Sequence, residues 1–134
     1  MTFSLFLFSC QKETPPPTCT ITMAGLSGTY KIGAIQYRLT ASSAPVDYLA
    51  LMDACEKDDL LQLKNDGTYI YTDAGMVCSP NGSSTGTWSL SGTVLTSDGL
   101  LAGTIEGYDC KTLVCFIDNV NVPGDRVTQT LVRQ

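Results

Sequence analysis

Residues 59–73, Asp-Leu-Leu-Gln-Leu-Lys-Asn-Asp-Gly-Thr-Tyr-Ile-Tyr-Thr-Asp, decide the fold that this chain can adopt. Two short runs rich in leucine, tyrosine and threonine flank Asp66-Gly67, a pair that suits the positive φ angles of a tight hairpin turn. The pattern predicts one strand over 59–65 and a second over 68–73. A two-residue loop would pair Asn65 with Thr68, whereas a three-residue loop with a bulge would shift the register by one.

The same kind of segment recurs along the rest of the chain. Short runs of β-branched and aromatic residues alternate with turn signals such as Ser91-Gly92 and Asp98-Gly99, as in sandwiches and barrels of antiparallel strands. Val46 to Ala54 lacks period-two alternation and follows Pro45, so it predicts a short helix. Six further strands are predicted, over 28–39, 86–91, 93–97, 100–107, 111–118 and 125–133. We therefore expect an all-β, eight-stranded antiparallel up-and-down barrel, with one short helix between its first two strands.

Strands that alternate in direction give such a barrel two different ends. The connections at 66–67, 91–92 and 108–110 are tight and share one end, the closed end. The other end, the mouth, receives the helix segment and the longer loops 74–85 and 119–124. An eight-stranded barrel has an interior that is either filled by side chains or holds one small ligand.

Apolar side chains recur at every second position of several predicted strands and would share the inner face of the barrel. They would form either a packed core or a pocket for a small apolar or amphipathic molecule, with tyrosine hydroxyls as its polar groups. The candidates to line this pocket are Tyr30, Leu61, Leu63, Tyr69, Tyr71, Trp88, Leu90, Ile105 and Leu113.

The composition excludes several functions. The chain has 13 acidic residues, 8 basic residues and no histidine, for a net charge of −5. A nucleic-acid partner needs a basic face, so none is expected. Without histidine, Ser-His-Asp and Cys-His catalytic sets are excluded, and zinc is not expected because there is no C-x-x-C spacing either. The carboxylates around Asp58 and Asp59 are interpreted as a solvated acidic rim, with a calcium site as the alternative. We expect a protein that is not an enzyme and that has no cofactor.

The beginning of the chain resembles a bacterial lipoprotein signal. Residues 5–10, Leu-Phe-Leu-Phe-Ser-Cys, form an apolar run that ends in a small residue and a cysteine, too short to span a bilayer. The resemblance implies cleavage before Cys10 and attachment of lipid to Cys10. The residues Gln11-Lys12-Glu13 look like the polar signal that sends such lipoproteins to the outer surface. The expected division is a short signal segment over 1–9, a tether over 10–24 and the barrel over 25–134.

The six cysteines of an exported chain indicate disulfides. With a two-residue hairpin loop, the register continued outward places Cys55 opposite Cys78, within disulfide reach. Cys19 and Cys110 both fall at the closed end and form the second expected pair. Cys115 would then be a buried free thiol that behaves as a small apolar residue.

An ordered series of short motifs resembles the lipocalin-like lipoproteins of Bacteroidetes-type bacteria. The motifs are Gly28-Thr29-Tyr30, Cys55-Glu56-Lys57-Asp58-Asp59, Asn65-Asp66-Gly67-Thr68-Tyr69, Cys78, Gly86-Thr87-Trp88-Ser89-Leu90 and a final Leu131-Val132-Arg133. The resemblance implies an eight-stranded barrel, a Cys55–Cys78 bridge and a ligand that is not characterised. In the wider superfamily an arginine late in the last strand covers an aromatic ring of the first strand, which implies a cation–π contact of Arg133 with Tyr30.

These observations predict an outer-membrane lipoprotein, on the periplasmic or cell-surface side, that is anchored through Cys10. It would bind a small apolar or amphipathic ligand at its helix-covered mouth. The alternative is a filled barrel that serves as an interaction or structural module and docks a partner protein or a glycan at the cell surface. A cavity much smaller than about 300 Å³ would favour this alternative. The sequence leaves the ligand and the oligomeric state open.

Overall fold

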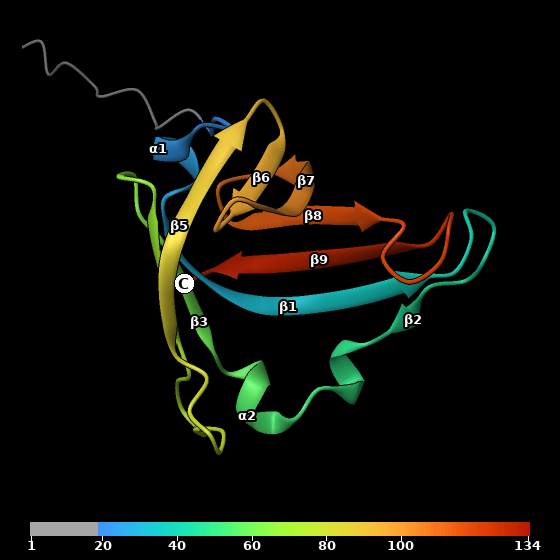
Figure 1. Cartoon of the computed structure of the whole chain (residues 1–134), viewed down its shortest axis with the longest axis horizontal. Coiled ribbons are helices and arrows are strands. Elements are labelled where there is room, and N and C mark those ends of the chain that lie inside the picture. Colours follow the sequence, from blue (N-terminus) through green and yellow to red (C-terminus); the bar gives the residue numbers. More distant parts are fainter. Residues whose placement is uncertain (1–18) are drawn as a thin grey trace, which may run out of the picture.

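The computed structural model describes residues 19–134, so the predicted lipidation site Cys10, the signal segment 1–9 and most of the tether lie outside the described residues. One antiparallel sheet and a few short helices make up the described part (Figure 1). The helices are α1 (Met23–Leu26), the 3-10 turn η1 (Leu49–Leu51) and α2 (Ala54–Lys57). The strands are β1 (Gly28–Arg38), β2 (Val46–Asp47), β3 (Leu60–Leu63), β4 (Thr68–Thr72), β5 (Ser84–Ser91), β6 (Val94–Ser97), β7 (Leu100–Tyr108), β8 (Thr112–Asp118) and β9 (Arg126–Arg133).

The sheet closes into a ring. Each strand from β3 to β8 pairs with the next, β3 also pairs with β1, and β9 returns to pair with β1. This last pairing runs from Tyr30 opposite Arg133 to Arg38 opposite Arg126. The two-residue β2 is only a flank on β1, so the eight longer strands form the predicted all-β up-and-down barrel. Each of these eight strands therefore has a paired neighbour on both of its sides.

The hairpin between β3 and β4 has a three-residue loop. The Lys64 N–H donates to the Thr68 carbonyl over 2.9 Å and so encloses three loop residues. Gly67 has a φ of 85°, which a residue without a Cβ adopts at little cost. The Asp66 carboxylate accepts a hydrogen bond from the Thr68 N–H over 2.9 Å and stabilises this turn. The two-residue loop, with Asn65 opposite Thr68, is therefore wrong, and the shifted register is the one that forms.

The segment 46–54 is not the continuous helix that was predicted. Its first two residues form β2 on the edge of β1, η1 is a single 3-10 turn, and Met52 is extended. The Asp47 carboxylate accepts a hydrogen bond from the Leu49 N–H over 2.9 Å, and such local bonds compete with a helix. A short α-helix does lie between β1 and β3, as predicted, but it is α2 and it begins at Ala54.

The helix α1 covers the closed end of the barrel. The Thr22 hydroxyl caps it by accepting a hydrogen bond from the Gly25 N–H over 2.9 Å. The Leu26 side chain is fully buried beneath it. Two tyrosine hydroxyls of the barrel donate to its last carbonyls, Tyr30 to Leu26 over 2.6 Å and Tyr108 to Gly25 over 2.5 Å. These contacts hold α1 across the end of the ring.

Arg133 completes the closed end from β9. Its Nη2 lies 3.0 Å from the Tyr30 hydroxyl and 2.6 Å from the Tyr108 hydroxyl, and it also donates to the Gly25 carbonyl over 3.0 Å. Its guanidinium carbon is 5.4 Å from the centre of the Tyr30 ring, so the implied cation–π contact is confirmed. Burial and the hydrogen bond with Tyr108 raise the pKa of Tyr30 to about 12.

The barrel has one disulfide at each of its two ends. Cys19–Cys110 joins the segment before α1 to the turn between β7 and β8, with 5.4 Å between the Cα atoms. Cys55–Cys78 joins α2 to the long loop between β4 and β5, with 5.1 Å between the Cα atoms. Cys115 in β8 is buried and is the free cysteine of residues 19–134. Both predicted pairings and the predicted free thiol are confirmed.

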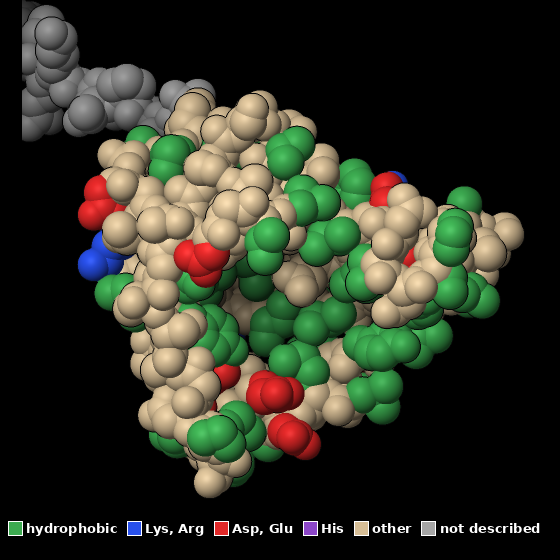
Figure 2. All heavy atoms as spheres, in the orientation of Figure 1, with side chains coloured by type: hydrophobic (Ala, Val, Ile, Leu, Met, Phe, Trp, Pro, Cys, Tyr) green, Lys and Arg blue, Asp and Glu red, His purple; other side chains and the backbone are tan. Residues whose placement is uncertain are grey.

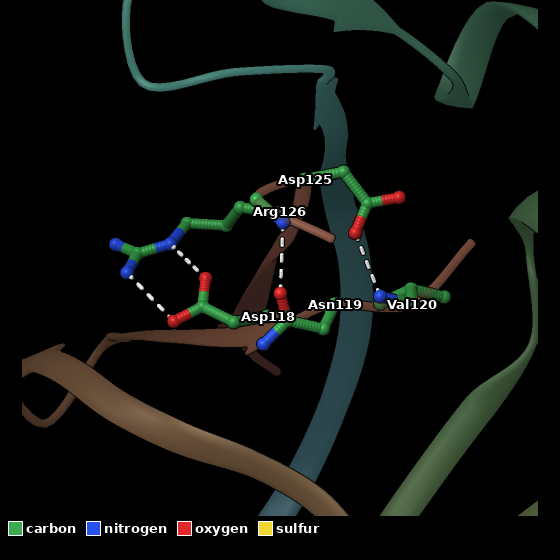
Figure 3. A network of polar contacts seen from close by, with 6 residues as sticks. Asp118, Asn119, Val120, Asp125 and Arg126 are labelled. Atoms are coloured by element: carbon green, nitrogen blue, oxygen red, sulfur yellow. Dashed lines mark hydrogen bonds and ion pairs between the residues drawn. The ribbon is translucent and has the colours of Figure 1, made fainter. Parts of the chain in front are cut away.

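One buried carboxylate organises the loop between β8 and β9 at the open end. The Asp125 side chain is 1% exposed, and Figure 3 shows it turned toward the loop. It accepts hydrogen bonds from the N–H groups of Val120 (2.7 Å), Asn121 (2.9 Å) and Val122 (3.0 Å) and from the Tyr37 hydroxyl (2.8 Å). Burial disfavours the charged form, but these hydrogen bonds outweigh it and hold the pKa of Asp125 below its ordinary value.

Replacing Asp125 by asparagine is expected to weaken the fold at pH 7 and to flatten its acid dependence. A carboxyl whose pKa is lower in the folded chain stabilises the fold above its unfolded pKa, and this contribution disappears as the pH falls through the folded value. Asp125→Asn should lower the melting temperature by about 5 °C at pH 7, and by much less below about pH 3.

Thermal unfolding at pH 7, 4 and 2.5 measures this effect. The control is Asp53→Asn, which changes an exposed carboxylate that makes no capping hydrogen bond. A melting temperature that falls equally with pH in the Asp125 variant and in the unchanged protein would contradict the assignment.

Candidate functional site

A cavity of about 280 Å³ lies inside the ring and is open to solvent. Figure 2 shows this hollow on one face of the molecule, with hydrophobic side chains on its floor and walls. Strands from opposite sides of the barrel supply the lining, so only the closed ring brings these side chains together. We call it the main cavity.

Six of the nine predicted pocket residues line the main cavity. They are Leu61, Leu63, Tyr69, Tyr71, Trp88 and Leu113. Tyr30 lines a second, adjacent cavity instead. Leu90 and Ile105 line neither cavity. Both lie toward the closed end, where the interior is filled: Ile105 is a buried member of the hydrophobic core and Leu90 packs against it.

The main cavity also has lining residues that the sequence analysis did not select. The principal ones are Leu95, Ser97, Ala102, Cys115, Gln129 and Leu131. Most continue the same period-two alternation along β6, β8 and β9, which could have found them. Gln129 gives no such signal, because a polar residue in an alternating strand is normally assigned to the outer face.

The floor of the main cavity is rigid. The Trp88 side chain is 5% exposed, and its indole Nε1 donates to the Lys64 carbonyl over 2.8 Å, which fixes the ring over the β3–β4 turn. Leu113 beside it is fully buried. Burial raises the pKa of the Cys115 thiol to about 11, so this wall group stays protonated and is a poor nucleophile near neutral pH.

The second cavity, of about 210 Å³, lies between β1 and α2. It shares four lining residues with the main cavity, namely Leu61, Tyr71, Gln129 and Leu131. Its remaining walls differ in character, because two carboxylates join the apolar side chains. These are Asp59, at the start of β3, and Glu56 on α2. We call it the acidic cavity.

Asp59 and Tyr71 form a hydrogen-bonded pair in the wall of the acidic cavity. The Tyr71 hydroxyl donates to Asp59 Oδ2 over 2.6 Å, and the Ala74 N–H donates to Asp59 Oδ1 over 3.2 Å. Asp59 is 6% exposed. Burial, the hydrogen bond to Asp59 and the nearby negative charges raise the pKa of Tyr71, which therefore remains a protonated donor.

A second tyrosine–carboxylate pair stands at the rim of the main cavity. The Tyr69 hydroxyl donates to Asp98 Oδ2 over 2.7 Å, and the Thr87 N–H donates to Asp98 Oδ1 over 2.9 Å. These bonds fix the β6–β7 turn, where Asp98 itself has a φ of 53°. They thereby hold β4, β5 and β6 in place around the opening.

The described residues were also compared with what a metal site and a membrane-spanning helix require. Within residues 19–134 no three histidine, cysteine, aspartate or glutamate side chains are placed so that they could hold a metal ion. No helix in the same part of the chain is both long and apolar enough to cross a membrane.

The fold and the cavity agree with a comparison to known families. The model of the lipocalin-like domain family matches residues 26–111, which is more than half of the chain, and the chain therefore belongs to this family. Comparisons with curated proteins and with solved structures find no match. The matched residues run from the end of α1 to the β7–β8 turn, so β8 and β9, which close the ring, lie beyond them.

Proposed function

We propose that this protein binds a small apolar or amphipathic ligand inside its barrel and does no chemistry on it. The observation that carries the proposal is the main cavity, an open space of about 280 Å³ with mostly apolar walls inside a closed ring. Ligand sites usually begin near about 300 Å³, and an apolar void of about 150 Å³ already accepts benzene. The cavity thus suits a compact ligand rather than a long lipid.

The polar groups around the cavities support a binding role over a catalytic one. The Tyr71 hydroxyl and the Cys115 thiol are both held protonated, and Asp59 is occupied by two hydrogen bonds. Such groups can orient a ligand, but none is paired as a nucleophile with a base.

The proposal includes an anchor at the outer membrane through lipid on Cys10. The described chain enters at the closed end, where Cys19 is bridged to Cys110. The lining of the main cavity includes Ser84 at the start of β5 and Ser97 at the end of β6, which lie away from that end. An anchor before Cys19 would therefore leave the opening turned away from the membrane, where a ligand can reach it.

Blocking the opening should abolish binding without unfolding the protein. Ala102 is exposed and lines the main cavity, so a phenyl ring in its place would occupy the entrance. Ala102→Phe is expected to weaken binding of the neutral fluorophore N-phenyl-1-naphthylamine by about tenfold or more, because overfilled sites exclude their ligand. Fluorescence titration measures binding, and a melting curve should shift by less than about 2 °C.

The matched control is Leu101→Phe. Leu101 precedes Ala102 on the same strand, is 56% exposed and lines neither cavity, so this variant should bind as the unchanged protein does. If the fluorophore fails to bind the unchanged protein, or if both variants weaken it equally, the pocket is not a ligand site.

A second candidate function, a module that docks a partner protein or a glycan, is favoured by one observation. The segments between β1 and β3 and between β4 and β5 carry exposed apolar side chains, among them Leu51 (71% exposed), Met76 (61%) and Val77 (53%). Exposed apolar patches often mark interaction sites. Under this alternative a partner at the cell surface retains the protein. Ala102→Phe would leave this retention unchanged, whereas Leu51→Ser combined with Met76→Ser would weaken it.

A further inference from the structure

We propose that the main cavity and the acidic cavity form one site for an amphipathic amine. The apolar body of the ligand would occupy the main cavity, and its protonated amino group would lie in the acidic cavity beside Asp59 and Glu56. This inference rests on the proposed ligand-binding function and assigns the chemical class of the ligand.

The two cavities meet along a shared wall. Four side chains, those of Leu61, Tyr71, Gln129 and Leu131, line both of them, so the spaces lie against the same surfaces. A ligand that contacts both regions would lie between these four side chains, so the proposal places its chain there. Its two ends would then meet very different surroundings, leucine and tryptophan on one side and carboxylates on the other.

The charges of the walls favour a cation. Asp59 accepts two hydrogen bonds and is almost completely buried, and Glu56 stands at the exposed edge of the same cavity. Among the residues that line the two cavities there is no lysine or arginine. Arg133, on the far side of Tyr30, is engaged at the closed end. A carboxylate head would lose water beside negative charge with no counter-charge, which is unfavourable.

The remaining wall groups suit an ammonium head as well. A carboxylate has about four positions that accept hydrogen bonds, so Asp59 can accept more than the two it has. Gln129 adds an amide oxygen, another acceptor. Tyr71 also lines the acidic cavity, and the faces of aromatic rings attract cations. The negative charges of Asp59, Asp73 and Glu56 all act on the Tyr71 hydroxyl, in agreement with this geometry.

Three probes with the same chain and different heads test the inference. Octylamine, octanol and octanoate are titrated into the full chain at pH 7 by isothermal titration calorimetry, and the amine is protonated at this pH, as a lysine side chain is. We expect octylamine to bind about tenfold more tightly than octanoate, with octanol between them, because only the heads differ in their interaction with the carboxylates.

Two variants identify the carboxylates responsible. Glu56→Gln and Asp59→Asn should each reduce the preference of octylamine over octanoate to about threefold or less. Glu106→Gln is the control, because it removes one negative charge from an exposed position of β7 that lines neither cavity, and it should leave the preference unchanged. Asp59 also holds Tyr71 and Ala74, so Glu56→Gln keeps the test valid if Asp59→Asn does not fold.

The outcomes separate this inference from the proposed function. If all three probes bind equally, or octanoate binds most tightly, the pocket remains a ligand site and the assignment of an amine is overturned. A preference for octylamine that Glu56→Gln and Glu106→Gln reduce equally would also overturn it, because net charge alone would then be the cause. If no probe binds, the ligand-binding proposal itself fails and this inference fails with it.

Discussion

Replacing both Cys19 and Cys110 by serine is expected to lower the free energy of unfolding by about 4–5 kcal/mol. This bridge spans 91 residues of sequence and therefore restricts most of the unfolded chain. Cys55 and Cys78 are only 23 residues apart, and the same loop-closure argument gives about 3 kcal/mol for their removal. The first double variant should thus be clearly the less stable of the two.

Urea unfolding of both double variants, without reductant, measures this difference. Serine is used at all four positions so that no new thiol is left to pair with Cys115. Equal stability of the two variants, or a greater loss for the Cys55 and Cys78 variant, would show that native contacts at the bridges, not loop length, decide their contributions.

Replacing Leu26 by alanine is expected to cost about 3 kcal/mol, within the usual range of about 2–5 kcal/mol for a buried leucine. Leu26 is fully buried in the core cluster beneath α1, at the closed end of the barrel. The smaller side chain would leave a void that the ring cannot fill, because the Tyr30 and Tyr108 hydroxyls hold α1 at a fixed distance. The melting temperature should fall by about 10 °C.

The control for this variant is the same substitution at Leu51, which is 71% exposed on η1. Leu51→Ala should change the stability by less than about 0.5 kcal/mol. Leu26 lines neither cavity, so Leu26→Ala should still bind N-phenyl-1-naphthylamine at temperatures where it is folded. Equal losses at the two positions would contradict the description of α1 as a packed cover.

The strands of the barrel could be predicted from local patterns because their causes are local. Alternation of apolar residues marks each strand, and Ser91-Gly92 and Asp98-Gly99 mark turns that form where expected. The pairing of β9 with β1 confirms the closed barrel, which was predicted from a meander with one tight end and one elaborated end. Cys19–Cys110 followed from the end of the barrel on which both cysteines fall. Cys55–Cys78 also forms, although the two-residue hairpin register from which it was predicted does not.

The two wrong predictions, the helix over 46–54 and the hairpin register, depend on pairing and turn geometry that the sequence of one segment does not reveal. The residues 46–54 have good helix formers, but pairing with β1 takes the first two of them and the Asp47 carboxylate favours a turn. The register of the β3–β4 hairpin depended on whether Asn65 belongs to the loop or to the strand, which a turn dipeptide alone does not decide.

The candidate site was predicted in its apolar residues and in Tyr69 and Tyr71, whereas Asp59 and Gln129 were missed as wall residues. Leu61, Leu63 and Leu113 follow the alternation, and the barrel places them inward. Asp59 was assigned to a solvated rim, whereas it is buried and bonded to Tyr71. Inward polar residues can be recognised only when the strands that satisfy or surround them are known.

The pairing of β9 with β1 brings the two limits of the described chain to the same end of the molecule, where the Gln134 N–H donates to the Thr29 carbonyl over 2.8 Å. A reporter protein fused after Gln134 would consequently emerge at the closed end, where the neighbouring Arg133 donates to the Gly25 carbonyl of α1. Such a fusion would leave ligand access unobstructed, whereas a tag inserted in the loop 119–124 would sit at the open end. A tag after Gln134 would also suit immobilisation of the protein on a sensor surface for binding measurements.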